Sequence, residues 1–159
     1  MNNLKTLMLV VSAMMSCGVT AREIQVEFEI PVFDTADYNK PYVAIWLELP
    51  KVNETLLLWH LKSAKDDKWL PDIRRWWRKL GRYGDPVDGV TGATRGPGGY
   101  HEVFNVDAEG SSTLLIEVVR EDGGRSLLKQ RVDLSGEAQQ FILPADKEIG
   151  ETKITLGEI

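Results

Sequence analysis

The chain has 159 residues, of which 43% are hydrophobic and one is a cysteine, and its net charge at pH 7 is −5. This length fits one domain that can bury a core without disulfides or a structural metal. The acidic balance disfavours a nucleic-acid partner.

The first 21 residues have the features of a secretory signal peptide. Lys5 precedes an apolar run within residues 7–15, and the segment ends in Val-Thr-Ala. We expect cleavage after Ala21, which leaves residues 22–159 as a single exported domain. The apolar run is too short for a comfortable transmembrane span, and no later segment is apolar enough for one.

Cys17 leaves a second interpretation open, in which the protein is a lipoprotein anchored through Ser16-Cys17-Gly18. With cleavage after Ala21, the mature chain has no cysteine and 18 basic against 24 acidic residues, a net charge of −6. Disulfides, thiolate catalysis and Cys-ligated metal sites are then excluded.

The chain after the signal peptide reads mainly as β-strands. In "REIQVEFEI", hydrophobic and polar residues alternate, as in a strand buried on one face. "YVAIWLEL" and "TLLLWHL" are rich enough in apolar residues to lie in the middle of a sandwich. Further strands are expected at "YHEVFNV", in a hairpin "TLLIEVVRE-DGG-RSLLKQRVDL", and at "QFIL" and "TKITL".

One helix is predicted between the third and fourth of these strands. In "PDIRRWWRKLG", Ile73, Trp76, Trp77 and Leu80 recur at helical spacing, with Arg and Lys on the other arc. With six to eight strands and no βαβ rhythm, the sequence predicts a mainly β fold: an antiparallel, immunoglobulin-like β-sandwich with one inserted amphipathic helix.

Few residues indicate catalysis or metal binding. His60 and His101 are the only histidines, and neither has acidic neighbours at metal-ligand spacing. No serine lies in a nucleophile elbow. We therefore predict no catalytic residues and no metal site.

The basic and aromatic residues around the predicted helix allow two interpretations. Between Lys62 and Arg82 there are eight basic residues, interleaved with tryptophans. They can form a helix that caps the sandwich with its Trp face and leaves its Arg face in water. They can also form a wall that receives an anionic aromatic ligand by stacking and by Arg–phosphate pairing.

The stretch Asp88-Gly89-Val90-Thr91-Gly92-Ala93-Thr94 fits the pattern D-x-x-[ST]-G-A-[ST]. This pattern resembles the site at which periplasmic flavin transferases attach FMN to a threonine. The flavin-carrying subunits of the sodium-pumping quinone reductase and of the Rnf complex are modified on the last Thr of such a motif. The resemblance implies covalent FMN on this loop, whereas the plain alternative is a turn shaped by Gly and Asp.

The residue types suit such an attachment. The hydroxyl of Thr94 can form a phosphoester with FMN, with Thr91 as the second candidate. Small neighbours, Gly92 and Ala93, leave room for the transferase, and Asp88 is a candidate recognition contact. Arg95 could neutralise the remaining phosphodiester charge.

The mature chain also resembles a family of predicted periplasmic proteins, domain of unknown function 2271, through "VEFEI", "KPYVAIWLE", "VTGATRGPG" and the late hairpin. Members are associated with flavin transferases and with membrane reductases bearing PepSY domains, which implies an electron-transfer setting. The flavin-carrying subunits have a different fold around their motif, so here a sandwich has to present the loop independently.

These observations predict a periplasmic electron carrier or accessory subunit rather than a turnover enzyme. Its expected partners are a periplasmic flavin transferase and a membrane PepSY-type reductase, and FMN would do the redox chemistry. The alternative from another class is a flavin-free binding or scaffold module that docks on a membrane reductase through the Trp/Arg helix. A third option is a sandwich that binds a small ligand noncovalently between this helix and the loop.

Overall fold

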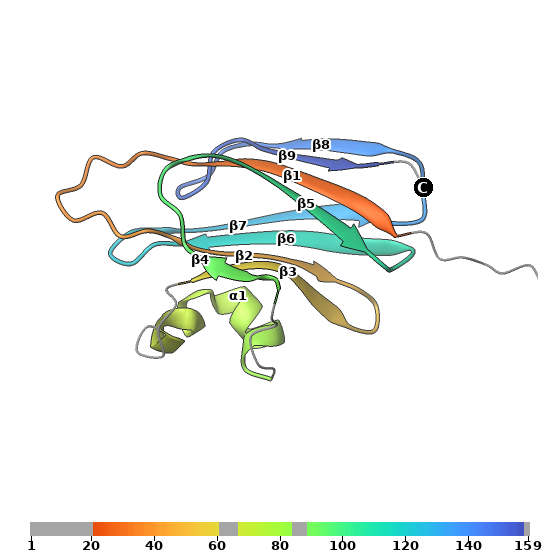
Figure 1. Cartoon of the computed structure of the whole chain (residues 1–159), viewed down its shortest axis with the longest axis horizontal. Coiled ribbons are helices and arrows are strands. Elements are labelled where there is room, and N and C mark those ends of the chain that lie inside the picture. The colour runs from red at the N-terminus through yellow and green to blue at the C-terminus, as the bar shows by residue number, and fades with distance from the viewer. Residues whose placement is uncertain (1–20, 61–66, 84–88, 158–159) are drawn as a thin grey trace, which may run out of the picture.

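The protein is described by a computed structural model over residues 21–60, 67–83 and 89–157. The described part is mainly β and forms two facing sheets with a short helical passage against one of them (Figure 1). Its strands are β1 (Arg22–Ile30), β2 (Tyr42–Glu48), β3 (Asn53–His60), β4 (Thr91–Ala93), β5 (Gly98–Val106), β6 (Ser111–Val119), β7 (Arg125–Asp133), β8 (Gln139–Leu143) and β9 (Thr152–Leu156).

One sheet has four strands in the order β5-β1-β9-β8, and the other has five in the order β4-β3-β2-β6-β7. All pairings are antiparallel except that of β3 with β4. The eight strands that the sequence predicts are present, and β1 begins at the first residue after the predicted cleavage position. The prediction of an all-antiparallel arrangement is wrong at β4, because the helical passage between β3 and β4 carries the chain back to run parallel.

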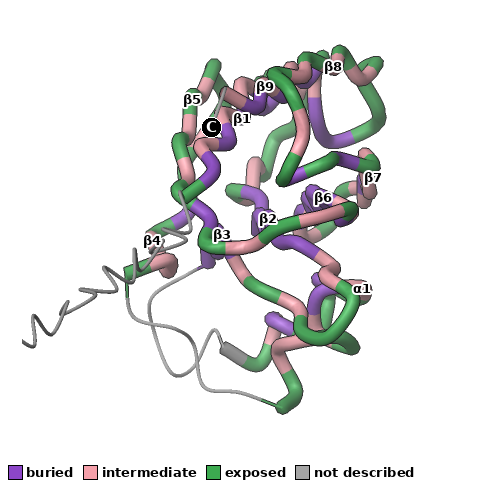
Figure 2. The backbone as a smooth tube through the Cα atoms, turned by 90° about the vertical axis from the view of Figure 1, so that its right-hand side faces the viewer, coloured by how far each residue is buried: buried purple, intermediate pink, exposed green. Residues whose placement is uncertain are grey.

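The main core lies between the two sheets. The alternation in β1 has the predicted result: Ile24, Val26, Phe28 and Ile30 are buried, and Figure 2 shows buried stretches along the facing strands. They pack with residues from the other sheet, among them Val43 and Ile45 of β2 and Leu114 of β6. The hydrophobic alternation in the sequence is therefore the main determinant of this layer.

A second core lies on the outer face of the five-stranded sheet. Leu70, Ile73 and Trp76 from the helical passage cover Ala44 and Trp46 of β2. The six residues from Tyr42 to Leu47 are consequently buried one after another, which explains why β2 reads as an unbroken apolar run.

The helical passage differs from the single amphipathic helix that the sequence predicts. It consists of a 3₁₀ segment η1 (Asp67–Asp72), one turn of α-helix α1 (Arg74–Trp76) and a π-type turn η2 (Trp77–Gly81). The break falls at Ile73, whose ψ of 72° is not helical and whose side chain is fully buried against the sheet. Burial therefore overrides the helical periodicity: Trp76 is also buried, while Trp77 and Leu80 are only partly covered.

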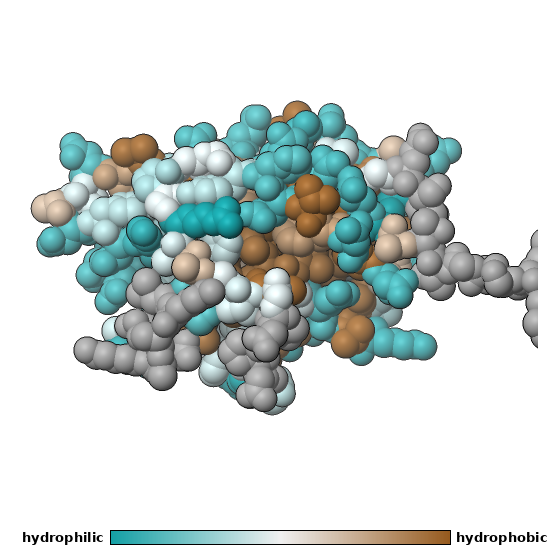
Figure 3. Space-filling model, viewed as in Figure 1, coloured by the Kyte–Doolittle hydropathy of each residue, from teal (hydrophilic) through white to brown (hydrophobic). Residues whose placement is uncertain are grey.

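The two sheets leave an apolar strip on one face of the molecule. In Figure 3, hydrophobic side chains gather between the edges of the two sheets, with hydrophilic side chains around them. On this edge, β4 pairs with Leu58–His60, and the rest of β3 has no second strand neighbour among the described residues.

Candidate functional site

The predicted FMN-attachment segment lies at a sheet edge rather than in a free loop. Thr91, Gly92 and Ala93 form β4, which pairs with Leu58–His60 of β3. Asp88, the predicted recognition contact, lies outside the described residues. The structure therefore places Thr91 and the two small residues of the motif on one short strand.

Thr94, directly after β4, is held tightly against the protein. Its side chain is buried, at 8% exposure, and its hydroxyl donates a hydrogen bond to the carbonyl oxygen of Pro41. Its backbone N–H donates to the carbonyl of His60 at 3.2 Å. In this conformation the hydroxyl cannot reach an external phosphoryl group, so an FMN ester does not fit Thr94 while β4 stays paired.

Thr91 and Ala93 are more accessible than Thr94. Thr91 is half-buried and has an interaction partner, and Ala93 is exposed. A Cβ added to Gly92 would lie 3.6 Å from Cδ1 of Trp59, an ordinary contact distance. Packing against Trp59 thus does not require glycine at this position.

Arg95, the predicted partner of the phosphodiester, is 53% exposed and already has neighbours. Its guanidinium lies over the rings of Trp59, at 4.8 Å from the centroid, and Tyr100, at 5.6 Å. It also pairs with the Glu102 carboxylate at 3.2 Å. Because the ion pair is near the surface and easily exchanged for water, Arg95 is available to another anion at small cost.

The two histidines lie in different sheets. In the described part of the chain, no group of three or more His, Cys, Asp or Glu residues could hold a metal ion. His60 is buried at the end of β3, whereas His101 lies on β5 and is exposed.

A second candidate site lies where the helical passage meets the start of β7. A hollow of about 540 Å³ is lined by Pro71, Arg74, Trp77, Arg78, Arg82 and Arg125. We call it the arginine pocket. Four of its six lining residues are arginines and none is acidic, so the pocket favours an anion.

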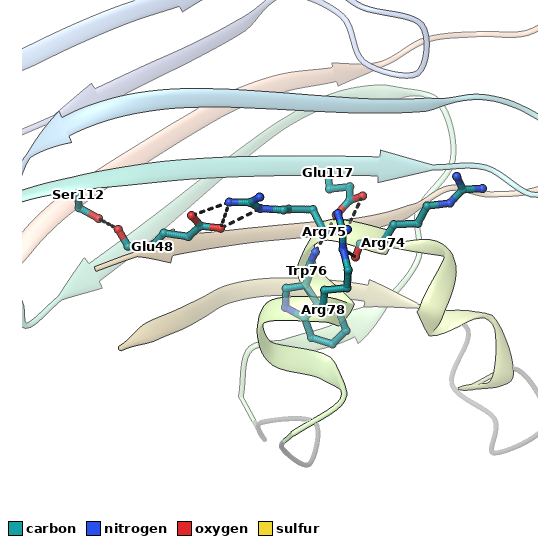
Figure 4. Close-up of polar contacts among 7 residues, drawn as sticks. All are labelled: Glu48, Arg74, Arg75, Trp76, Arg78, Ser112 and Glu117. Atoms are coloured by element: carbon teal, nitrogen blue, oxygen red, sulfur yellow. Dashed lines mark hydrogen bonds and ion pairs between the residues drawn. The ribbon is translucent and has the colours of Figure 1, made fainter. Parts of the chain in front are cut away.

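Sequence reasoning found only part of this pocket. The basic and aromatic pattern identified the residues from the helical passage, but Arg125 comes from the hairpin and was not considered. A buried carboxylate joins the two parts. Glu117 of β6 accepts hydrogen bonds from the backbone N–H groups of Arg75 and Trp76 at 3.0 and 2.9 Å (Figure 4). It also accepts one from Nε of Arg125 at 2.6 Å. Glu117 thereby satisfies N–H groups at the start of α1, as a capping side chain does.

Arg75 faces away from the pocket and anchors the passage to β2. Its guanidinium makes a two-pronged contact with the Glu48 carboxylate, with nitrogen–oxygen distances of 2.8 to 3.0 Å (Figure 4). The backbone carbonyl of Glu48 in turn accepts a hydrogen bond from the Ser112 hydroxyl at 3.1 Å. Of the arginines on α1, Arg75 is therefore structural.

The chain matches a known protein family over most of its length. A family described as a predicted periplasmic protein, domain of unknown function 2271, matches residues 23–151. The chain belongs to this family. No curated protein and no solved structure matches it.

Membership places the protein in the periplasm, as the sequence predicts. The match covers the motif segment, the arginine pocket and all strands except β9, so both candidate sites lie within the region that matches the family. Among the described residues, no helix has the length and apolar character needed to cross a membrane.

Proposed function

We propose that this periplasmic protein carries FMN on Thr94 and acts as an electron carrier or accessory subunit. The observation that carries the proposal is that the T-G-A part of the motif, Thr91–Ala93, forms β4, a three-residue strand at a sheet edge with one strand neighbour, and that Thr94 follows it directly. A strand of this kind is among the least stable parts of a sheet, since few bonds hold it.

Attachment requires that β4 leaves β3. The flanking contacts that break include the hydrogen bond from Leu58 N–H to the Val90 carbonyl at 2.8 Å and both hydrogen bonds of Thr94. Each contributes about 0.5–1.5 kcal/mol net. The released hydroxyl would then bond to the phosphorus of a flavin phosphate anhydride while the bond from that phosphorus to the bridging oxygen breaks. The second phosphate of the anhydride would leave with the bridging oxygen and take up the hydroxyl proton.

The residues near Thr94 suit a bound phosphodiester. Arg95 is adjacent in sequence and can exchange its surface ion pair with Glu102 for the diester charge. When attached, FMN supplies the redox chemistry, and the chain positions it. The proposed partners are a periplasmic flavin transferase, for attachment, and a membrane PepSY-type reductase, for electron exchange.

Coexpression with a periplasmic flavin transferase tests the proposal. The purified protein should be yellow and heavier by one FMN less one water, with the added mass on the peptide that contains Thr94. Thr94→Val should abolish the adduct, whereas Thr94→Ser, which keeps a hydroxyl, should retain it. Thr91→Ala should be modified more than Thr94→Val, and Asp88→Ala should lower the yield.

A chain that stays unmodified while the same transferase labels a control substrate would overturn this function. The second candidate, a flavin-free module that docks on a membrane reductase, would then be the better account. It is favoured by the exposure of Arg74, Arg78 and Arg82 on the helical passage, next to the partly covered ring of Trp77. The third option, a ligand held noncovalently between helix and loop, would be supported by flavin that is lost on denaturation.

We also propose that the two-sheet architecture is of the immunoglobulin-like type. In such folds, two interlocked strand pairs, one in each sheet, form the centre of the sandwich. Here β1 pairs with β5 in one sheet, and β2 pairs with β6 in the other. The last strand, β9, occupies the place beside β1 that an N-terminal strand would take.

A further inference from the structure

We propose that the arginine pocket binds a small molecule that combines a phosphate group with a flat aromatic group. This inference is independent of FMN attachment at Thr94, because it concerns other residues on another part of the five-stranded sheet.

The arginines of the pocket carry more positive charge than the described carboxylates around them balance. Of the four arginines in the pocket, only Arg125 pairs with a carboxylate within the described residues. Arg78 donates from Nε to the carbonyl of Arg74 at 3.2 Å, and Arg82 lies 5.9 Å from the ring centroid of Tyr83. Within the described part of the chain, the guanidinium groups of Arg74, Arg78 and Arg82 therefore have no carboxylate partner, which matches a phosphomonoester that carries about −1.5 to −2 at pH 7.

A buried residue holds the walls of the pocket in place, so the pocket is not a chance crowding of flexible side chains. Glu117 is fully buried and holds both walls, the start of α1 and the guanidinium of Arg125. The Glu117 carboxylate is occupied by these hydrogen bonds and does not line the pocket, so Glu117 fixes Arg125 beside the helical passage without adding negative charge to the lining. Positioning by a buried supporting residue is what a binding site requires.

The size and the lining of the arginine pocket also suit a small molecule. A volume of about 540 Å³ lies within the range of about 300–1,000 Å³ that is usual for small-molecule sites. The ring of Trp77 and the ring of Pro71 supply an apolar wall, and an indole face can stack on a flat aromatic group. Guanidinium groups bind phosphate oxygens in a two-pronged geometry.

The surroundings limit where an anion can lie. A neighbouring hollow of about 420 Å³ shares Arg74 and Arg125 with the arginine pocket, but acidic residues also line it: Asp72, Glu121 and Asp122. The excess positive charge is therefore confined to the side of Trp77, Arg78 and Arg82. A confined charge favours a small ligand over an extended anionic surface.

Isothermal titration with adenosine monophosphate, adenosine and inorganic phosphate tests the site. The monophosphate should bind most tightly, inorganic phosphate more weakly, and adenosine not measurably. Arg74→Gln with Arg82→Gln should weaken monophosphate binding at least tenfold. Trp77→Leu should weaken the monophosphate but leave inorganic phosphate unchanged, which separates stacking from charge.

Arg131→Gln is the matched control, because Arg131 is an exposed arginine on β7 outside the pocket. It should bind the monophosphate as the unchanged chain does. Arg74 and Arg82 are exposed, so their replacement should leave the far-UV circular dichroism unchanged.

Three results would overturn the inference. One is the absence of monophosphate binding at millimolar concentration. Another is an equal loss of binding in Arg131→Gln, which would indicate only general attraction of anions. The third is binding to anionic lipid vesicles without binding to the monophosphate, which would assign the arginines to a membrane surface.

Discussion

Replacing Glu117 by Ala should destabilise the protein, because this one side chain is the hydrogen-bond acceptor for three other groups. Its carboxylate is fully buried and accepts hydrogen bonds from Arg75 N–H, Trp76 N–H and Arg125. Without it, two N–H groups at the start of α1 lose their acceptor, and one of them, in Trp76, lies in a buried contact. The passage that covers the outer core would then be poorly anchored.

The magnitude follows from these contacts. A buried donor left without a partner costs about 1–3 kcal/mol, and a partly buried one costs less. Arg125 is 34% exposed and regains water, so its loss adds little. We therefore expect Glu117→Ala to lower the free energy of unfolding by about 2–4 kcal/mol. Glu117→Gln keeps one acceptor oxygen and should cost less.

Urea denaturation followed by tryptophan fluorescence measures this loss, provided that the slope with urea is unchanged. Glu54→Ala is the matched control, because Glu54 is an exposed carboxylate on β3, and it should change stability by less than about 0.5 kcal/mol. If Glu117→Ala stays within about 1 kcal/mol of the unchanged chain, burial of Ile73 and Trp76 alone would hold the passage, and the anchoring argument would be wrong.

Three further predictions concern individual side chains that are buried or partly buried. Ile73→Ala should cost about 2–4 kcal/mol in urea denaturation because the side chain is fully buried, and a negligible loss would contradict its place in the outer core. Glu148→Gln should also destabilise the protein, because the Glu148 carboxylate pairs with the buried guanidinium of Arg120 at 2.9 Å. An unchanged midpoint of urea denaturation would count against that pair. Burial raises the pKa of Tyr38 above 10.0, against the weaker opposite effect of Arg120. The free energy of unfolding should therefore be unaffected by ionisation of Tyr38 below pH 10.0, where its hydroxyl is neutral in both states, and should fall as the pH rises through the folded-state pKa. This fall should be larger in the unchanged chain than in Tyr38→Phe.

Much of the fold could be predicted because the order of apolar and polar residues along a strand indicates which of its faces are buried. The alternation in β1 and the apolar run in β2 correspond directly to one-sided and two-sided burial. β4 could not be predicted in this way. Its residues, Thr91–Ala93, have no strand pattern of their own, and they become a strand because the edge of β3 offers unpaired backbone groups.

The candidate sites were only partly predictable for a related reason. Glu117 stands in the apolar stretch "LLIEVV", where a carboxylate is a signal of a buried polar contact. Its partners, however, lie 41–42 residues earlier and 8 residues later in the chain, so periodicity cannot identify them. The arginine pocket depends on this long-range contact, which is why sequence reasoning found its helical wall and missed Arg125.

The burial of Thr94 means that the proposed flavin attachment would prevent β4 from pairing with β3 again. The unmodified side chain fits its place because its hydroxyl donates to the Pro41 carbonyl. An esterified oxygen has no hydrogen to donate, and the bulk of a flavin phosphate exceeds the space around a side chain that is 8% exposed. A modified Thr94 therefore could not return, and β4 would stay away from β3 with Arg95 no longer held over Trp59. Attachment would in this way turn a transient opening into a lasting one, and the edge of β3 that β4 now covers would become available to a partner.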